Sequence, residues 1–167
     1  MRGQRNTGKM AEAAVNCRAH LRSRPRGSRH RGAQNEMITA FSTKEPVDHA
    51  GLYETFLARE GDTSGTVVLH HGRVKRPGKQ VPGFSRVELS AVTADVDKRL
   101  LELAREAEER FGLNQVLVAH RIGTIGAGDT VLLVIVSCRS RGPAFSACAW
   151  IVDQIKKEEI IALAELT

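Results

Sequence analysis

The stretch VIVSCRSRGPAFSACAWIVDQIKK, residues 134–157, places a buried strand, a short basic loop and a helix in direct succession. Pro143 marks the first turn of the helix, because proline lacks the N–H that would need a partner there and its φ angle is already helical. We expect this helix to run from Pro143 to about Glu159. It should be deeply packed, since apolar residues such as Phe145 surround nearly its whole circumference. The neighbouring segments then have to pack on this strand–loop–helix unit.

Two arginines and a helix start lie together in the loop of this unit. Arg139 and Arg141 accompany the free N–H groups at Gly142, where the helix dipole adds about half a positive charge. Such a corner suits an anion, although a solvated loop is the alternative for a single junction of this kind. A second basic pair, His120 and Arg121, ends the preceding strand and favours the anion site.

A hairpin precedes the unit. Residues 115–123 and 130–137 have the pattern of strands, and GAGD at residues 126–129 has that of a tight turn between them. The second strand is apolar on both faces, which predicts a central position in its sheet. His120 and Arg121 are neighbours on the first strand and should therefore point to opposite faces near its end.

The clearest helix lies earlier in the chain. From Val96 to Phe111, apolar residues recur at helical spacing along one stripe, and charged residues lie off it. Thr93 is the expected N-cap and Gly112 the expected C-terminal stop. A shorter helix is expected over residues 46–59. We interpret the long helix as scaffold and not as part of a site.

A strand rich in β-branched residues spans residues 66–75 and leads through a basic Gly/Pro loop into a returning strand at residues 84–92. Lys75 falls at the end of the first strand. His70 and His71 are adjacent on it and should face opposite sides, each with an ordinary hydrogen bond, instead of sharing a metal. The pattern predicts a hairpin with a mobile, solvated loop.

Length and composition fit one soluble globular domain with extra chain. The 167 residues leave no room for two full cores, and no apolar run reaches the roughly 18–20 residues that span a bilayer. Cys17, Cys138 and Cys148 are too few and too scattered for a disulfide framework, which favours a reducing compartment and a cytoplasmic location. No catalytic triad, metal cluster, phosphate loop or dinucleotide fingerprint occurs, and we expect neither a metal nor an organic cofactor.

Positive charge is concentrated in residues 1–36, which hold nine Lys or Arg and two Glu, whereas residues 37–167 hold 16 basic and 17 acidic residues. The first segment is rich in Arg, Gly and Ser and has no apolar period, so we expect a basic disordered extension. We interpret it as an appendage before a functional start near Met37. A nucleic-acid-binding arm and a transit-like presequence are the alternatives.

The order of the segments resembles one known family. GTVVLHHGRVK, the ELSAV strand before the acidic helix, VLVAHRIG, GAGDTVLLVIVS and AFSACAWIVDQIKKEE follow one another as in the large, catalytic subunit of molybdopterin synthase, the MoaE family. The HRIG…GD hairpin and the R-x-x-AF helix are the most specific pieces. The resemblance covers roughly residues 37–159, so we interpret residues 37–167 as a MoaE-like domain.

The resemblance implies an α+β fold, the α/β-hammerhead, with a mostly antiparallel sheet and two main helices. It also implies a homodimer that binds a small ubiquitin-like sulfur-carrier subunit, MoaD-like, at each end. The carrier's C-terminal Gly-Gly thiocarboxylate would deliver two sulfurs to cyclic pyranopterin monophosphate and so build molybdopterin. This pterin phosphate is thus the expected small ligand, and neither a membrane nor a nucleic acid is an expected partner.

Position by position, the resemblance assigns roles to a set of basic and helix-start residues. Lys156 is the expected acid/base or acceptor group, and Lys157 its helper. Binding of the substrate and of the carrier tail is assigned to Lys75, His120, Arg121, Arg139, Arg141 and Gly142.

Three positions depart from the family pattern. Lys75 replaces the arginine of the family's G-x-V-R strand end, and Ser140 replaces the histidine of its loop motif. The family's second catalytic lysine falls on Leu163 without a gap, or on Lys157 with a short deletion. Two alternatives therefore stay open: a non-catalytic MoaE-like module that binds the carrier, and nucleic-acid binding through residues 1–36.

Overall fold

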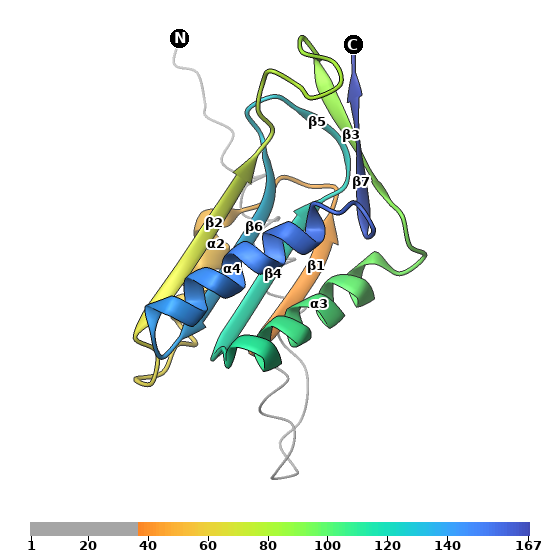
Figure 1. Ribbon diagram of the computed structural model, residues 1–167. Helices are drawn as coiled ribbons and strands as arrows, with labels where there is room; N and C mark the ends of the chain where they lie inside the picture. The colour runs from red at the N-terminus through yellow and green to blue at the C-terminus, as the bar shows by residue number, and fades with distance from the viewer. Residues whose placement is uncertain (1–36) are drawn as a thin grey trace, which may run out of the picture. The chain divides into compact units, whose positions relative to one another are not determined.

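Residues 37–167 are the part of the chain that the structure, a computed structural model, describes (Figure 1). In chain order the elements are β1 (Ile38–Thr43), α2 (His49–Leu57), β2 (Thr66–Arg73), β3 (Arg86–Ala91), α3 (Val96–Phe111), β4 (Gln115–Arg121), β5 (Gly123–Gly126), β6 (Thr130–Cys138), α4 (Arg141–Ile155) and β7 (Ile161–Leu166). No helix among these residues has the length and apolar character needed to span a bilayer. The expectations for residues 1–36, disorder and nucleic-acid binding included, lie outside the described residues.

The strands form two sheets. β1, β4, β6 and β2 make a four-stranded sheet in that order, and β5, β3 and β7 make a three-stranded sheet. β1 and β4 run parallel, while the other paired strands of the described residues are antiparallel. The predicted α+β class is confirmed, with a mostly antiparallel sheet and with α3 and α4 as its two main helices.

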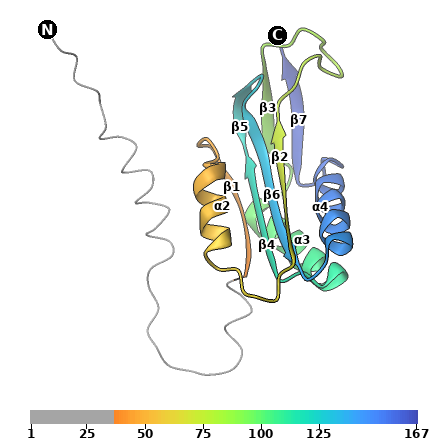
Figure 2. The ribbon, with the colours of Figure 1, turned by 90° about the vertical axis from the view of Figure 1, so that its left-hand side faces the viewer.

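The four-stranded sheet is covered on both faces, by α3 and α4 on one side and by α2 on the other (Figure 2). Its strand β6 lies between β4 and β2. Side chains of β6 alternate between two cores: Val134 and Val136 pack with α3 and α4, and Leu133 and Ile135 pack with α2. The predicted central strand is confirmed, because burial on both faces requires apolar residues at successive positions.

α3 spans the predicted residues Val96–Phe111 and ends as predicted. Gly112 ends the helix with a φ of 62°, a conformation that glycine adopts without strain. The N-cap, however, is Asp95 and not the predicted Thr93. The Asp95 carboxylate accepts a hydrogen bond from the N–H of Lys98 at 3.0 Å, because it stands directly before the first helical residue, where a side-chain oxygen can reach the first turn.

The predicted pairing of β2 with β3 is wrong. β2 pairs with β6, from Thr66 opposite Cys138 to Arg73 opposite Thr130, whereas β3 pairs with β5 and β7. β4 and β6 do pair as predicted, but β5 lies between them in the sequence and joins the other sheet. The apolar alternation of a strand reports its burial and leaves its partner open, which is why the β2–β3 error arose.

The C-terminal part also differs from the prediction. α4 begins at Arg141 and ends at Ile155 instead of near Glu159, and β7 follows it. Glu158 has a positive φ of 60°, which turns the chain out of the helix. Phe145, which was expected to be packed, keeps 61% of its surface exposed. α4 therefore buries one side on the sheet and presents the other.

Candidate functional site

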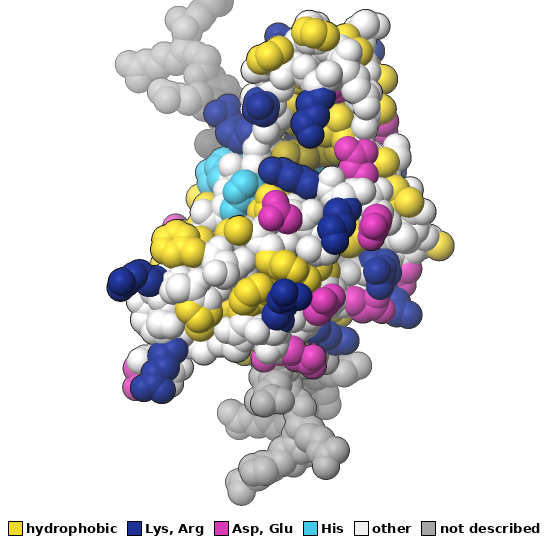
Figure 3. Space-filling view, viewed as in Figure 1, with side chains coloured by type: hydrophobic (Ala, Val, Ile, Leu, Met, Phe, Trp, Pro, Cys, Tyr) yellow, Lys and Arg dark blue, Asp and Glu magenta, His cyan; other side chains and the backbone are white. Residues whose placement is uncertain are grey.

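A groove of about 360 Å³ lies between β2 and α4. β2 is an edge strand of its sheet, and α4 lies across the strands in front of the sheet (Figure 1). Figure 3 shows this face of the molecule, where histidine and hydrophobic side chains lie beside Lys and Arg side chains. The groove is lined by Val68, Leu69, His70, Phe145, Cys148, Ala149, Val152 and Asp153. A mostly apolar groove with a few polar groups is typical of a ligand or peptide site.

His70 points from β2 into this groove. Its Nε2 atom is 3.1 Å from the point where a Cβ of Gly72 would stand, so the ring lies along the strand over that glycine. Within residues 37–167 the ring makes no hydrogen bond, so the predicted ordinary hydrogen bond is wrong for this residue. Burial lowers the pKa of His70 below 6.5, and the charges of Lys156 and His71 lower it further. The ring is therefore neutral at pH 7 and has a nitrogen free to accept a proton.

Lys156 directly follows the last residue of α4 and lies near His70. Its side chain is exposed, and its positive charge is among the causes that lower the pKa of His70. Lys157 points elsewhere, because its Nζ donates a hydrogen bond to Oε1 of Gln154 at 2.7 Å, back along the helix. Of the two lysines predicted to be catalytic, Lys156 is thus the one beside the groove.

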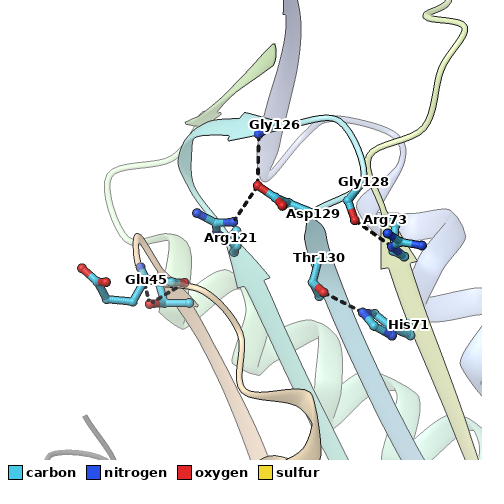
Figure 4. A network of polar contacts seen from close by, with 9 residues as sticks. Glu45, His71, Arg73, Arg121, Gly126, Gly128, Asp129 and Thr130 are labelled. Carbon is cyan, nitrogen blue, oxygen red and sulfur yellow. Dashed lines mark hydrogen bonds and ion pairs between the residues drawn. The ribbon is translucent and has the colours of Figure 1, made fainter. Parts of the chain in front are cut away.

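His120 and Arg121 end β4, and the structure uses them differently. His120 is only 5% exposed, and its Nδ1 donates to the carbonyl oxygen of Arg121 at 2.7 Å. The Arg121 guanidinium lies 3.9 Å from the Asp129 carboxylate (Figure 4). Within the described residues its Nε has no hydrogen-bond partner. Arg121 therefore has spare hydrogen-bonding capacity at the end of the sheet, whereas His120 is committed to the backbone.

The turn between β5 and β6 is also held from the side of β2 (Figure 4). Arg73 donates from Nε to the carbonyl oxygen of Gly128 at 2.7 Å. His71 and Thr130 share a hydrogen bond of 2.6 Å between Nε2 and Oγ1, and the His49 ring stacks on the His71 ring with centroids 4.6 Å apart. The predicted hydrogen bond of a strand histidine is confirmed for His71. The His71 ring is hydrogen-bonded and stacked on the α2 side of the sheet, away from the groove.

Lys75 lies just beyond β2, at the start of the loop to β3. Glu165 on β7 holds this loop, because its carboxylate accepts backbone hydrogen bonds from Lys79, Gln80 and Val81 at 2.7, 2.8 and 2.5 Å. The bond from Val81 is the largest cause that lowers the pKa of Glu165 below 4.5. The loop that was expected to be mobile is thus tied to the C-terminal strand.

Arg139, Arg141 and Gly142 lie at the opposite end of α4 from Lys156. The backbone of Arg139 packs against Gly65, just before β2 begins, and Arg141 is the first residue of the 15-residue helix. At 1.5 Å per residue the two ends of α4 are about 21 Å apart. Within one chain the predicted site residues therefore do not surround a single concavity.

The predicted site residues of one chain fall into two regions. Arg139, Arg141 and Gly142 form the first. The second lies at the other end of the four-stranded sheet, where His120 and Gly72 both stand opposite Leu132. It contains Lys75, His120, Arg121 and Lys156.

Two residues near the second region were missed by the sequence analysis. His70 and His71 were placed on opposite faces of their strand, but nothing in the sequence indicated which of the two faces α4 covers. Glu165 was missed because β7 was not predicted. Leu163, on which the family's second lysine falls without a gap, lies on β7 opposite Leu89. The position of the family's second lysine therefore has no cationic group in this alignment.

The cysteines of the described residues are buried thiols. Cys148 lines the groove, and burial raises its pKa to about 11, so it stays protonated at pH 7. Cys138 donates from Sγ to the carbonyl oxygen of Gly112 at 3.4 Å. Across residues 37–167 there is no cluster of three or more His, Cys, Asp or Glu side chains placed to hold a metal ion.

Comparison with known sequences gives matches over most of the chain. A family model described as MoaE protein matches residues 42–158. The molybdopterin synthase catalytic subunit of Pyrococcus abyssi is 32% identical over 126 residues, which are 74% of this chain and 82% of that protein. The molybdopterin synthase catalytic subunit of Vibrio cholerae is 36% identical over 126 residues, which are 74% of this chain and 81% of that protein.

Comparison with solved structures gives the same fold. Molybdopterin synthase from Staphylococcus aureus matches with a TM-score of 0.62 and 24% identity, over 78% of this chain and 89% of that chain. A complex of subunits 1 and 2 of the molybdopterin-converting factor from Helicobacter pylori matches with a TM-score of 0.61 and 13% identity, over 77% and 84%. At these identities the structures bear on the fold alone, and they confirm the predicted fold class.

Proposed function

The chain belongs to the MoaE protein family, and from this premise we propose that it works as the catalytic subunit of a molybdopterin synthase. It transfers sulfur from the thiocarboxylated C-terminus of a small ubiquitin-like carrier subunit to cyclic pyranopterin monophosphate, in the cytoplasm. Two such transfers complete the dithiolene of molybdopterin. The structural observation that supports this role is a groove between β2 and α4 with Lys156 beside it.

We place the carrier's C-terminal Gly-Gly segment in this groove. Two glycines need no side-chain pockets, and the apolar lining by Val68 and Val152 shields the tail from water. Phe145 also lines the groove and is exposed, so it offers an apolar contact to the body of the carrier. The similarity to a two-subunit complex of this fold supports a protein partner.

Lys156 acts on the end of the bound tail. Its ammonium group stabilises the negative charge that develops on the acyl oxygen during sulfur transfer, or transfers a proton there. Lys157, the next residue, assists it as a second positive charge. A lysine can also form a transient covalent bond with an acyl group, which makes Lys156 the acceptor candidate as well.

The phosphate of the pterin substrate is bound by the remaining basic residues. The Nε of Arg121 has no hydrogen-bond partner within residues 37–167, and Lys75 is exposed just beyond β2. His120 positions Arg121 through its bond to the Arg121 backbone. The first region, which contains Arg141, is about 21 Å from Lys156 in the same chain. We propose that a homodimer brings this region of one chain to the Lys156 end of the other.

Sulfur transfer in a reconstituted reaction tests the proposal. The purified chain, a thiocarboxylated carrier and cyclic pyranopterin monophosphate should yield molybdopterin. Lys156→Ala should reduce the rate by about 10²-fold or more, as expected when a proton-transfer group is lost. Full activity of Lys156→Ala would remove this residue from the mechanism, and an inactive wild-type chain would contradict the function.

A second candidate function is a module that binds the carrier without catalysis. The observation that favours it is Leu163, which lies on β7 where the family pattern has a lysine. This candidate predicts that the carrier is retained by the immobilised chain while no molybdopterin forms. Turnover by the wild-type chain would exclude it.

A further inference from the structure

We propose that His70 is a general base of this enzyme, which activates water at the acyl carbon of the carrier tail. It takes over proton transfer in a chain that lacks the family's lysine at Leu163. The inference rests on the proposed function, because it requires the tail to lie in the groove between β2 and α4.

The chemistry of sulfur transfer requires such a base. When a thiocarboxylate sulfur displaces an oxygen substituent from a substrate carbon, that oxygen leaves with the substituent, and carrier and substrate are joined by a thioester. Water then attacks the acyl carbon: a C–O bond forms, the C–S bond breaks, and the sulfur stays on the substrate as a thiolate. One proton of the water passes to the base as the C–O bond forms. The second proton leaves the new carboxyl group for the thiolate or the solvent.

The position of His70 suits this step. The ring lines the groove in which the tail is placed, and no hydrogen bond within residues 37–167 occupies its nitrogens. It lies over Gly72, where a side chain would displace it, since its Nε2 is 3.1 Å from the position of a Cβ there. A histidine with both nitrogens available beside an acyl carbon meets the geometric requirement for a general base.

The groups around His70 keep it in the form that accepts a proton. Cys148 and Asp153 face it from α4, Lys156 lies beyond the end of that helix, and His71 is its neighbour on β2. Cys148 is a neutral thiol, while the charges of Lys156 and His71 oppose a proton on His70. The pKa of His70 therefore lies below 6.5, and the neutral ring predominates at pH 7.

Lys156 and His70 then have different tasks. The positive charge of Lys156 stabilises the oxyanion of the tetrahedral intermediate, and the neutral His70 removes a proton from water. The charge of Lys156 serves both tasks, because it stabilises the oxyanion and also keeps the base unprotonated.

The test compares His70→Gln with His71→Gln, a matched change on the same strand that faces α2 instead of the groove. Molybdopterin formation from thiocarboxylated carrier and cyclic pyranopterin monophosphate is followed from about pH 5 to about pH 8, which spans the ordinary titration of histidine. Mass spectrometry measures the carrier–substrate thioester. His70→Gln should lower kcat by about 10²-fold, accumulate the thioester and lose the fall in rate below pH 6.5. His71→Gln should keep the wild-type rate at about pH 8 and retain the fall in rate on acidification, displaced toward higher pH because one of the charges that lower the pKa of His70 is gone.

Thermal unfolding of both variants checks that they fold. In a third variant, His70→Ala, added imidazole should partly restore the activity. Wild-type turnover together with an unchanged rate and pH profile in His70→Gln would overturn the role of His70 and leave the proposed function standing. Absence of molybdopterin from the wild-type chain would overturn both. A slow His70→Gln variant without accumulated thioester would also overturn the role, since the base would then act in another step.

Discussion

Arg141 is the first residue of α4 and Lys156 directly follows its last, so these two predicted site residues lie at opposite ends of one helix. The distance of about 21 Å along the helix is far too long for two groups that act on one bound substrate. A twofold pairing of chains removes this difficulty, because each interface then brings a residue of one copy to a different residue of the other. The position of Arg141 thus argues for a site shared between two chains.

Complementation between two inactive variants tests the shared site. Arg141→Ala and Lys156→Ala homodimers should each be nearly inactive. Co-expression should restore about a quarter of the wild-type activity, because half of randomly formed dimers are mixed and each keeps one intact site of two. Purified mixed dimers that stay as inactive as either parent would contradict the shared site. Co-expressed Lys156→Ala and Lys156→Met, with both changes at one position, are the control and should stay inactive.

The coupling between Lys156 and His70 can be measured without any substrate. Lys156→Met removes a positive charge that lowers the pKa of His70, so this pKa should rise toward 6.5 in the variant. NMR titration of the imidazole resonances measures the change. Lys157→Met is the matched control, since the Lys157 ammonium is bonded to Gln154 instead. Equal His70 titration in the wild type and in Lys156→Met would show that the two groups are not close.

The predictability of this fold varied with the range of the interactions involved. The apolar stripe of α3 and the two apolar faces of β6 are local patterns, and both elements appear where the sequence places them. β7 was not predicted, because its short segment follows a turn at Glu158 whose positive φ has no glycine to mark it. β1 was missed for another reason: its pairing partner β4 lies more than seventy residues further along the chain, so no local pattern marks the pair.

The candidate site was predictable to the same extent. The family pattern pointed to Lys156, and the structure places it directly after α4 and near His70. The alternation of β2 correctly separated His70 from His71, yet it could not show which face α4 would cover. Arg139 and Arg141 were grouped with Lys156 on the family pattern, although the helix predicted from Pro143 already separates them in the sequence. The face of β2 that α4 covers depends on a contact between distant segments, which the sequence does not report.

Gly72 is expected to control the placement of the His70 ring. In Gly72→Ala the added Cβ would stand 3.1 Å from Nε2 of His70 and 3.2 Å from Cβ of Leu132, so the ring must move. We expect kcat to fall about tenfold or more while the free energy of unfolding changes by no more than about 1 kcal/mol. Gly83→Ala is the matched control, because a Cβ there meets no atom within 4 Å. Normal turnover in Gly72→Ala would show that the position of the ring is not critical.

Glu165 should act on substrate binding through the loop that follows Lys75. Glu165→Gln loses the negative charge that three backbone N–H groups share, so the amides of residues 79–81 should exchange with deuterium faster. The KM for the pterin substrate should rise several-fold, with a smaller change in kcat. Glu159→Gln, an exposed carboxylate just beyond α4, is the control. Unchanged exchange at residues 79–81 would separate Glu165 from the order of the loop.

The stability of the fold should fall as the pH drops through the range of its buried histidine. Burial lowers the pKa of His120 below 6.5, and its hydrogen bond to the carbonyl of Arg121 offsets part of this effect. Because the unfolded chain binds this proton at a higher pH than the folded chain, the stabilisation is complete above pH 6.5 and declines below it. The slope cannot exceed about 1.4 kcal/mol per pH unit for one proton.

His120→Asn isolates this contribution, since the asparagine amide can still donate near the position of Nδ1 but does not titrate. Urea unfolding at about pH 7.5 and about pH 5 should show a smaller loss of stability on acidification in the variant than in the wild type. Part of the loss of stability on acidification should remain in both proteins, because the pKa values of His70 and His71 are also lowered. An identical pH dependence in His120→Asn would mean that the ring of His120 does not resist protonation in the folded chain.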